Sequence, residues 1–226
     1  MTSRYNLKYL LIGLLILLLA IPTDEQFFGN AADYIVSLSF ACMLVVGVWT
    51  LTYSKKWFTF GIVLAVAGFV LQVAAMFLDI RALKIAFFVV FIAFCILSVV
   101  IAFIEVTLAG QANVNRLMGA ICIYLLLGVI WGTLFILLEI VSPGSFGGLD
   151  AESQTRHSSQ LFYFSFVTIT TLGYGDITPE LPLVRTLTYL EAIVGQMYIA
   201  VLIAGLVGTH IANRTGGVGV EERGAE

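Results

Sequence analysis

Long apolar stretches separated by short polar ones are the dominant pattern in this chain. A helix needs about 20 apolar residues to cross the hydrocarbon core of a bilayer. Stretches near or above that length cover residues 7–22, 33–53, 57–78, 84–108, 119–141 and 183–212. A further apolar stretch, residues 161–171, is too short to span and is typical of a re-entrant segment. The pattern therefore predicts an all-α membrane protein with six transmembrane helices and one re-entrant helix.

The first apolar stretch allows a second interpretation. Arg4 and Lys8, followed by the apolar residues 9–20, also fit the start of a signal peptide. The sequence that follows, "LAIPTDEQ", has no small-x-small cleavage site. We therefore favour a retained helix.

The charges between the apolar stretches predict an orientation, because cytoplasmic loops carry an excess of lysine and arginine. If the N-terminus is inside, the cytoplasmic segments hold the basic residues Arg4, Lys8, Lys55, Lys56, Arg116, Arg214 and Arg223. The outer segments hold fewer, namely Arg81, Lys84, Arg156 and Arg185. We therefore expect a multi-pass protein of the cell membrane with both termini in the cytoplasm.

Composition agrees with a membrane protein and narrows the function. The 226 residues are 60% hydrophobic and 11% charged, whereas soluble domains are about 25% charged. The net charge of −3 gives no argument for nucleic-acid binding. Cys42, Cys95 and Cys122 lie inside apolar stretches without zinc-site spacing, so we expect packing roles. We find no nucleotide loop, metal cluster or nucleophile constellation, and therefore predict no enzyme activity and no cofactor.

The stretch "TITTLGYGDITP", residues 168–179, places flexible and polar residues between two apolar segments. Irregular backbone at membrane depth is tolerated only where it is buried or lines a wet path. Successive carbonyls can face one axis only if some residues adopt left-handed dihedrals, and Gly173 and Gly175 do so without steric cost. Tyr174 would then point its ring outward. Thr171 would add a carbonyl and a hydroxyl at the inner end.

These residues resemble the selectivity filter of potassium channels, which have valine where this chain has Leu172. The resemblance covers residues 117–213 and implies an outer helix, a re-entrant pore helix, a filter loop and an inner helix. It also implies that K+ binds the backbone carbonyls of Thr171, Leu172, Gly173 and Tyr174. One strand cannot surround an ion, so a homotetramer in contact with membrane lipids is expected.

The resemblance also assigns supporting residues. Thr170 and Asp176 flank the filter, and Tyr163 and Phe164 match an aromatic pair that braces it, with the Tyr163 hydroxyl able to reach Asp176. Both aromatic residues could instead simply fill volume. Val167 stands where some bacterial members carry a glutamate.

Further resemblances concern the two long helices of the predicted pore. Gly195 has the spacing of a gating hinge, although a glycine in a helix can also mark close packing. Gln196, Ile199 and Ile203 follow at helical spacing and would line the cavity, although Gln196 could bond a neighbouring helix. Carboxylates inside a membrane are costly and default to functional candidates. Glu139 and Glu191 are accordingly expected to support the filter rather than to bind the ion.

Residues 1–116 form a predicted four-helix block, and residues 214–226 a short, disordered cytoplasmic tail. Voltage-gated relatives carry an arginine ladder in their fourth helix, but residues 85–108 contain no basic residue. We therefore predict a channel that is not strongly voltage-gated. The alternatives are a non-conducting or regulatory subunit that co-assembles with other channels, and a potassium-transporter subunit. The single loop in this chain argues against the transporter. An unidentified regulatory subunit remains a possible partner.

Overall fold

The computed structural model describes residues 7–27, 40–45, 47, 55–108, 114–150 and 154–221. Within these ranges it describes the side chains of residues 9–19, 40–45, 47, 57–104, 106, 117–150 and 157–205. The helices are α1 (Leu7–Phe27), α3 (Lys55–Leu78), α4 (Arg81–Leu108), α5 (Val114–Val141), α6 (Gln154–Ile169) and α7 (Pro182–Glu221). Two strands, β1 (Phe146–Gly147) and β2 (Thr178–Pro179), pair antiparallel.

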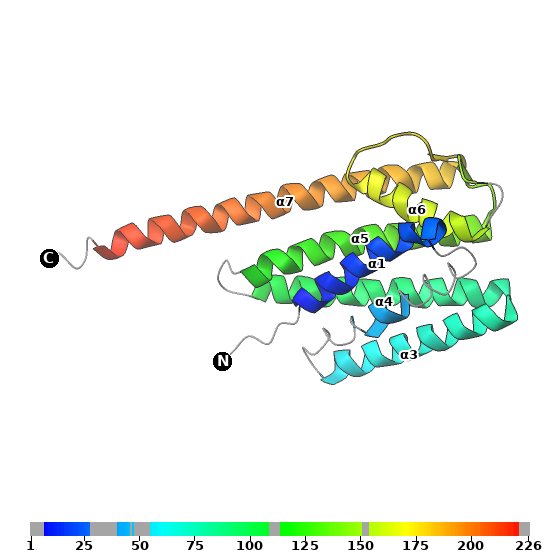
Figure 1. Cartoon of the computed structure of the whole chain (residues 1–226). Coiled ribbons are helices and arrows are strands. Elements are labelled where there is room, and N and C mark those ends of the chain that lie inside the picture. Colours follow the sequence, from blue (N-terminus) through cyan, green and yellow to red (C-terminus); the bar gives the residue numbers. More distant parts are fainter. Residues whose placement is uncertain are drawn as a thin grey trace.

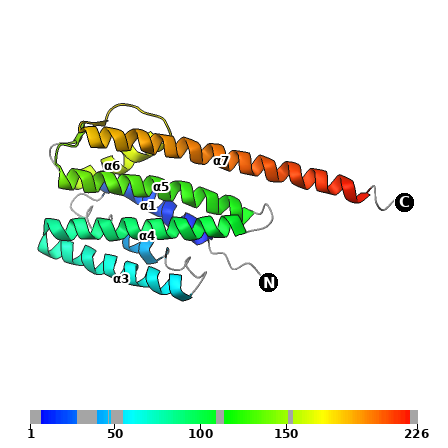
Figure 2. The ribbon, with the colours of Figure 1, turned by 180° about the vertical axis from the view of Figure 1, so that it is seen from behind.

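The long helices lie roughly side by side in one bundle (Figure 1). α3 packs on α4, α4 packs along α5, and α1 lies against α5 and α6. α6 is enclosed between α5 and α7, and the loop that joins α6 to α7 lies on the side away from α3 (Figure 2). The start of α1 and the end of α7 point to the same end of the bundle.

Four of the described helices contain a stretch long and apolar enough to cross a membrane. These stretches are Trp57–Leu78, Arg81–Ile104, Leu117–Val141 and Pro182–Gly205. They match the last four of the six predicted spans, and they agree with a membrane protein. The described apolar part of α1, Tyr9–Leu19, is shorter. Most of the second predicted span, residues 33–53, lies outside the described residues, so six crossings remain a prediction.

One continuous hydrophobic core crosses the predicted boundary between residues 116 and 117. Leu14 on α1, Phe91 on α4 and Leu126 on α5 are fully buried in the same cluster. The ring centroid of Phe40 lies 4.8 Å from that of Phe91 and 5.9 Å from that of Phe162 on α6. The N-terminal helices therefore pack directly on the helices that carry the site, and the division at residue 116 stays a prediction.

The corner between α3 and α4 is tied to the end of α5. Arg81 donates through Nη2 to the carbonyls of Ile140 and Val141, at 2.6 and 2.8 Å. These carbonyls belong to the last turn of α5, where helical partners are missing and a cation is favourable. Lys84 Nζ lies 2.6 Å from Asp79 Oδ1, and this neighbour holds the pKa of Asp79 below its usual value.

The described residues are mostly helical, in agreement with the predicted all-α class. The two-residue strands β1 and β2 were not foreseen, and they form where the turn after α5 returns alongside the segment that follows the loop. One prediction about local structure is wrong. The residues after Asn213 were expected to be disordered, but α7 continues to Glu221. Extending a helix that already exists avoids the cost of nucleation, which outweighs the low helix propensity of the glycines in this segment.

Candidate functional site

The site begins where α6 ends. The N–H of Thr171 donates to the Thr168 carbonyl and the N–H of Leu172 to the Val167 carbonyl, both at 2.9 Å. These two bonds are the pattern of a helix C-cap whose first residue outside the helix is left-handed. Glycine is usual at that position, but here it is Thr171, with φ of 62°. A left-handed β-branched residue is an outlier that costs about 1–2 kcal/mol, so the cap holds the loop start in a strained conformation.

Positive φ recurs at every second residue of the loop. The values are 62° at Thr171, 57° at Gly173 and 78° at Gly175. The left-handed dihedrals expected at the two glycines are therefore confirmed, whereas that of Thr171 was not foreseen. A Cβ at Gly173 or Gly175 would meet no atom within 4 Å. Residues 171–176 are all exposed, so this run of backbone faces open space in a single chain.

The predicted aromatic pair divides between two environments. Tyr163 is exposed, and its hydroxyl donates to Asp176 Oδ2 at 2.8 Å, which is the contact that the sequence predicted. Phe164 points the other way and packs its ring 5.4 Å from those of Phe135 on α5 and Phe146 on β1. Tyr163 therefore ties α6 to the end of the loop, and Phe164 ties it to α5.

Glu139 supports the loop indirectly. Its carboxylate accepts from the N–H groups of Gly144 and Ser145, at 2.8 and 2.9 Å. The Ser145 carbonyl in turn accepts from the N–H of Glu180 at 2.9 Å. A Cβ at Gly148 would lie 2.0 Å from the carbonyl oxygen of Asp176, so the turn fits closely against the loop. Glu139 thus fixes a turn that holds the segment after Gly175.

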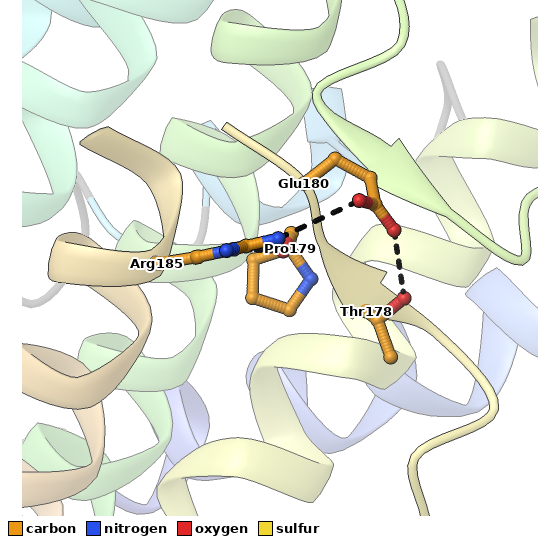
Figure 3. Close-up of polar contacts among 4 residues, drawn as sticks. All are labelled: Thr178, Pro179, Glu180 and Arg185. Carbon is orange, nitrogen blue, oxygen red and sulfur yellow. Dashed lines mark hydrogen bonds and ion pairs between the residues drawn. The ribbon is translucent and has the colours of Figure 1, made fainter. Parts of the chain in front are cut away.

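Polar contacts beyond those predicted anchor the same segment to α7 (Figure 3). Glu180 lies 3.6 Å from Arg185 Nη2 and accepts from the Thr178 hydroxyl at 3.3 Å. Arg185 Nε donates to the Pro179 carbonyl at 3.0 Å. Sequence reasoning missed these residues, because charged and polar side chains in a loop carry no motif that distinguishes a brace from a solvated surface.

α6 is also joined to both long helices beside it. Glu191 on α7 is fully buried, and its Oε1 lies 2.5 Å from the Ser165 hydroxyl, in agreement with the brace predicted for it. The Ser165 hydroxyl also lies 2.8 Å from the Gly128 carbonyl on α5. A Cβ at Gly128 or Gly132 would lie 2.6 Å from a phenylalanine ring of α6. Small residues four apart allow such close helix approach, a signal that sequence reasoning overlooked.

Gly195 lies against the end of α6. A Cβ there would come within 2.6 Å of both Cγ1 and the carbonyl oxygen of Ile169. That carbonyl also accepts from the Tyr124 hydroxyl of α5 at 3.1 Å. α7 continues as a helix through Gly195. Close packing is therefore a sufficient physical reason for this glycine, and its role as a hinge stays a prediction.

The predicted cavity-lining residues follow Gly195 along α7. Gln196 Nε2 lies 3.5 Å from the Thr171 hydroxyl, at the limit of a hydrogen bond. Ile199 is half-buried and Ile203 is exposed. Thr170 turns its hydroxyl back to the Phe166 carbonyl at 2.5 Å. Gln196 is thus near the loop start, and the lining role of all three residues stays a prediction.

Comparison with known proteins finds similarity to ion channels in the part of the chain that carries this geometry. Residues 119–209 match the ion channel family model. The chain is 36% identical over 81 residues to the inward rectifier potassium channel Kirbac3.1 of Paramagnetospirillum magnetotacticum. It is 32% identical over 65 residues to two pore potassium channel c of Oryza sativa subsp. japonica, and 30% over 94 residues to two-pore potassium channel 2 of Arabidopsis thaliana. Residues 119–209 are therefore similar to ion channels, and these three relatives are named as potassium channels.

The similarity covers less than half of this chain and a smaller part of each relative. The three matches cover 36%, 29% and 42% of this chain, respectively. In the same order, they cover 23%, 14% and 19% of the relatives, so the chain matches less than a quarter of each. No solved structure matches the chain. Residues 119–209 include most of α5, all of α6, the loop and the greater part of α7.

Proposed function

We propose that the protein is a potassium-selective channel through which K+ moves passively across the cell membrane. The observation that carries this proposal is the run of alternating positive φ values at Thr171, Gly173 and Gly175, directly after α6. The run lies in a pore domain whose relatives include proteins named as potassium channels.

A K+ ion that enters a bilayer loses its hydration shell. Backbone carbonyl oxygens must replace the water oxygens of that shell. Left-handed dihedrals at alternate residues allow the carbonyls of Thr171, Leu172, Gly173 and Tyr174 to face one axis. Carbonyl oxygens carry no net charge, so each site binds K+ weakly enough to release it. Leu172 replaces the usual valine, but its exposed side chain can point away from the ion path.

Assembly of four identical chains would cover the loop and the apolar side chains that are exposed in a single chain. Irregular backbone at membrane depth must be buried or must line water, yet the loop is exposed in one chain. α7 also leaves large apolar side chains exposed, including Ile193, Met197 and Val201. Fourfold cyclic symmetry would bring four loops around one axis and cover these side chains with neighbouring chains.

The helix directions support the proposed orientation. The start of α1 and the end of α7 share one end of the bundle, and the loop lies near the other. With both termini in the cytoplasm, α6 would enter from outside and the loop would return to the outer face. α6 followed by a non-helical return is the arrangement expected of a re-entrant pore helix.

Reconstitution of the purified full chain in liposomes with a K+ gradient tests the function. We expect K+ flux that exceeds Na+ flux and is blocked by barium, and native mass spectrometry of the same preparation should give a tetramer. Flux that does not distinguish K+ from Na+ would refute the filter assignment. Monomers or dimers in a preparation that still conducts would refute the assembly. Absence of flux, with restoration only when another channel subunit is added, would favour the regulatory alternative.

A further inference from the structure

Three oxygen atoms meet where α5, α6 and α7 pack together. The Ser165 hydroxyl oxygen of α6 lies 2.8 Å from the Gly128 carbonyl of α5 and 2.5 Å from Glu191 Oε1 of α7. Both distances are within the range of O–H···O hydrogen bonds. Ser165 and Glu191 are fully buried, so water does not reach this group of atoms from the surface of the chain.

Counting hydrogens shows which protonation state fits. A serine hydroxyl has one hydrogen to donate, a carbonyl only accepts, and an ionised carboxylate only accepts. If Glu191 were ionised, the single hydrogen of Ser165 would face two acceptors, and one of the two short contacts would have no hydrogen in it. If Glu191 carries a proton, it donates to Ser165, which donates to Gly128. Both contacts are then satisfied.

The second oxygen of the carboxyl group agrees with the neutral state. Glu191 Oε2 is buried and has no hydrogen-bond partner among the described residues. An unpartnered oxygen costs far more free energy on a buried ionised carboxylate than on a neutral acid. Tyr124 of α5 is a titratable neighbour of Glu191, but a tyrosine is either neutral or anionic and offers no positive counter-charge. Among the described residues, no cationic side chain forms an ion pair with Glu191.

We propose that Glu191 is protonated at neutral pH and donates to Ser165, which donates to the Gly128 carbonyl, so that this relay positions α6 between α5 and α7. The role in holding the filter rests on the function proposed above. Ser165 lies on α6, the helix that ends in the C-cap at Thr171. Gly195 lies one turn after Glu191 on α7, and its close contact with Ile169 holds the same end of α6. Glu191 is a positioning residue, since it lies away from the loop that would contact K+.

The relay makes conduction sensitive to alkaline pH. Loss of the Glu191 proton leaves Ser165 with one hydrogen for two acceptors, so α6 is released from α5 or from α7. We expect K+ flux to fall as pH rises, and to recover when pH is lowered. Glu191→Gln keeps a donor that cannot ionise, so its flux should not show this loss. Tyr124→Phe in the same assay removes the neighbouring titratable group and should leave the loss in place.

Infrared spectroscopy of the full chain in an ester-free detergent tests the protonation directly. Glutamate labelled with carbon-13 identifies the carbonyl stretch of a neutral glutamic acid. We expect this band in the wild-type protein at neutral pH and its absence in Glu191→Gln. A wild-type protein without the band would overturn the proposal. The readout does not require conduction, so failure of the proposed channel function and failure of the relay are distinguishable.

A pair of serine variants keeps the test decisive if Glu191→Gln does not assemble. Ser165→Ala removes the hydroxyl that accepts the hydrogen bond from Glu191, and Ser165→Thr keeps a hydroxyl. The band should shift in Ser165→Ala and stay near its wild-type position in Ser165→Thr. A band that is the same in all three proteins would show that Glu191 does not donate to Ser165.

Discussion

Substituting Gly175 by alanine should abolish selective conduction. Its φ of 78° lies in the left-handed region, and a Cβ there would meet no atom within 4 Å of the same chain. The penalty within one chain is therefore conformational rather than a clash. An L-residue in this region costs about 1–2 kcal/mol.

In the proposed tetramer, four chains would multiply that penalty. If all four loops must adopt the left-handed conformation together and their costs add, the total is roughly 4–8 kcal/mol. Since about 1.4 kcal/mol is a factor of ten, the population of intact filters falls by roughly 10³- to 10⁶-fold. The assay is K+ flux from liposomes, normalised to the amount of assembled tetramer.

Gly144 provides a matched control on the same chain. Its φ is 84°, and a Cβ there would also meet no atom within 4 Å, but it lies in the turn after α5. Gly144→Ala should carry a similar conformational penalty, but in the turn that supports the loop and not in the loop itself, so it should lower K+ flux and keep its selectivity. Normal selective flux from assembled Gly175→Ala, or equal loss in both variants, would refute the reasoning.

Three further predictions follow from packing and charge. Gly195→Ala should destabilise the assembly by roughly 1–3 kcal/mol, because its Cβ would meet the end of α6. Gly205→Ala on the same helix is the control, since its Cβ would meet nothing within 4 Å. Equal melting temperatures of the two variants would contradict the prediction. Asp79 has its pKa lowered by Lys84, so its stabilising contact should be present above about pH 3.8 and lost as pH falls through the folded-state pKa. The melting temperatures of wild type and Asp79→Asn should therefore converge in acid, and a constant difference at every pH would argue otherwise. Conductance should depend weakly on voltage, with a gating valence of about one charge or less per tetramer; gating currents that persist when permeation is blocked would reveal a missed sensor.

The local conformation at the glycines and the contact of Tyr163 could be predicted from sequence, because each depends on a few neighbouring residues. Gly173 and Gly175 could be predicted to be left-handed, because glycine adopts that conformation without a steric cost. The contact of Tyr163 with Asp176 was implied by the resemblance to potassium channels, and the structure contains it. Four of the predicted spans were found because length and apolarity alone define them.

Features that depend on residues far apart in sequence were not predictable in the same way. Thr171 was missed for a different, local reason: the cap at the end of α6 makes it left-handed, although its β-branched side chain disfavours that conformation. Glu139 supports the loop through two intermediate contacts, which no spacing rule contains. Ser165 is an unremarkable residue in the sequence, and only its place between α5 and α7 makes it a link.

The reversal potential of the reconstituted channel, with K+ on one side of a planar bilayer and Na+ on the other, tests the central claim most directly. Each tenfold preference for one monovalent ion displaces this potential by about 59 mV. We predict a displacement toward K+ selectivity of more than about 59 mV in the wild-type protein, retained in Gly144→Ala and lost in Gly175→Ala. A wild-type potential near zero, with measurable current, would contradict a filter built from residues 171–175.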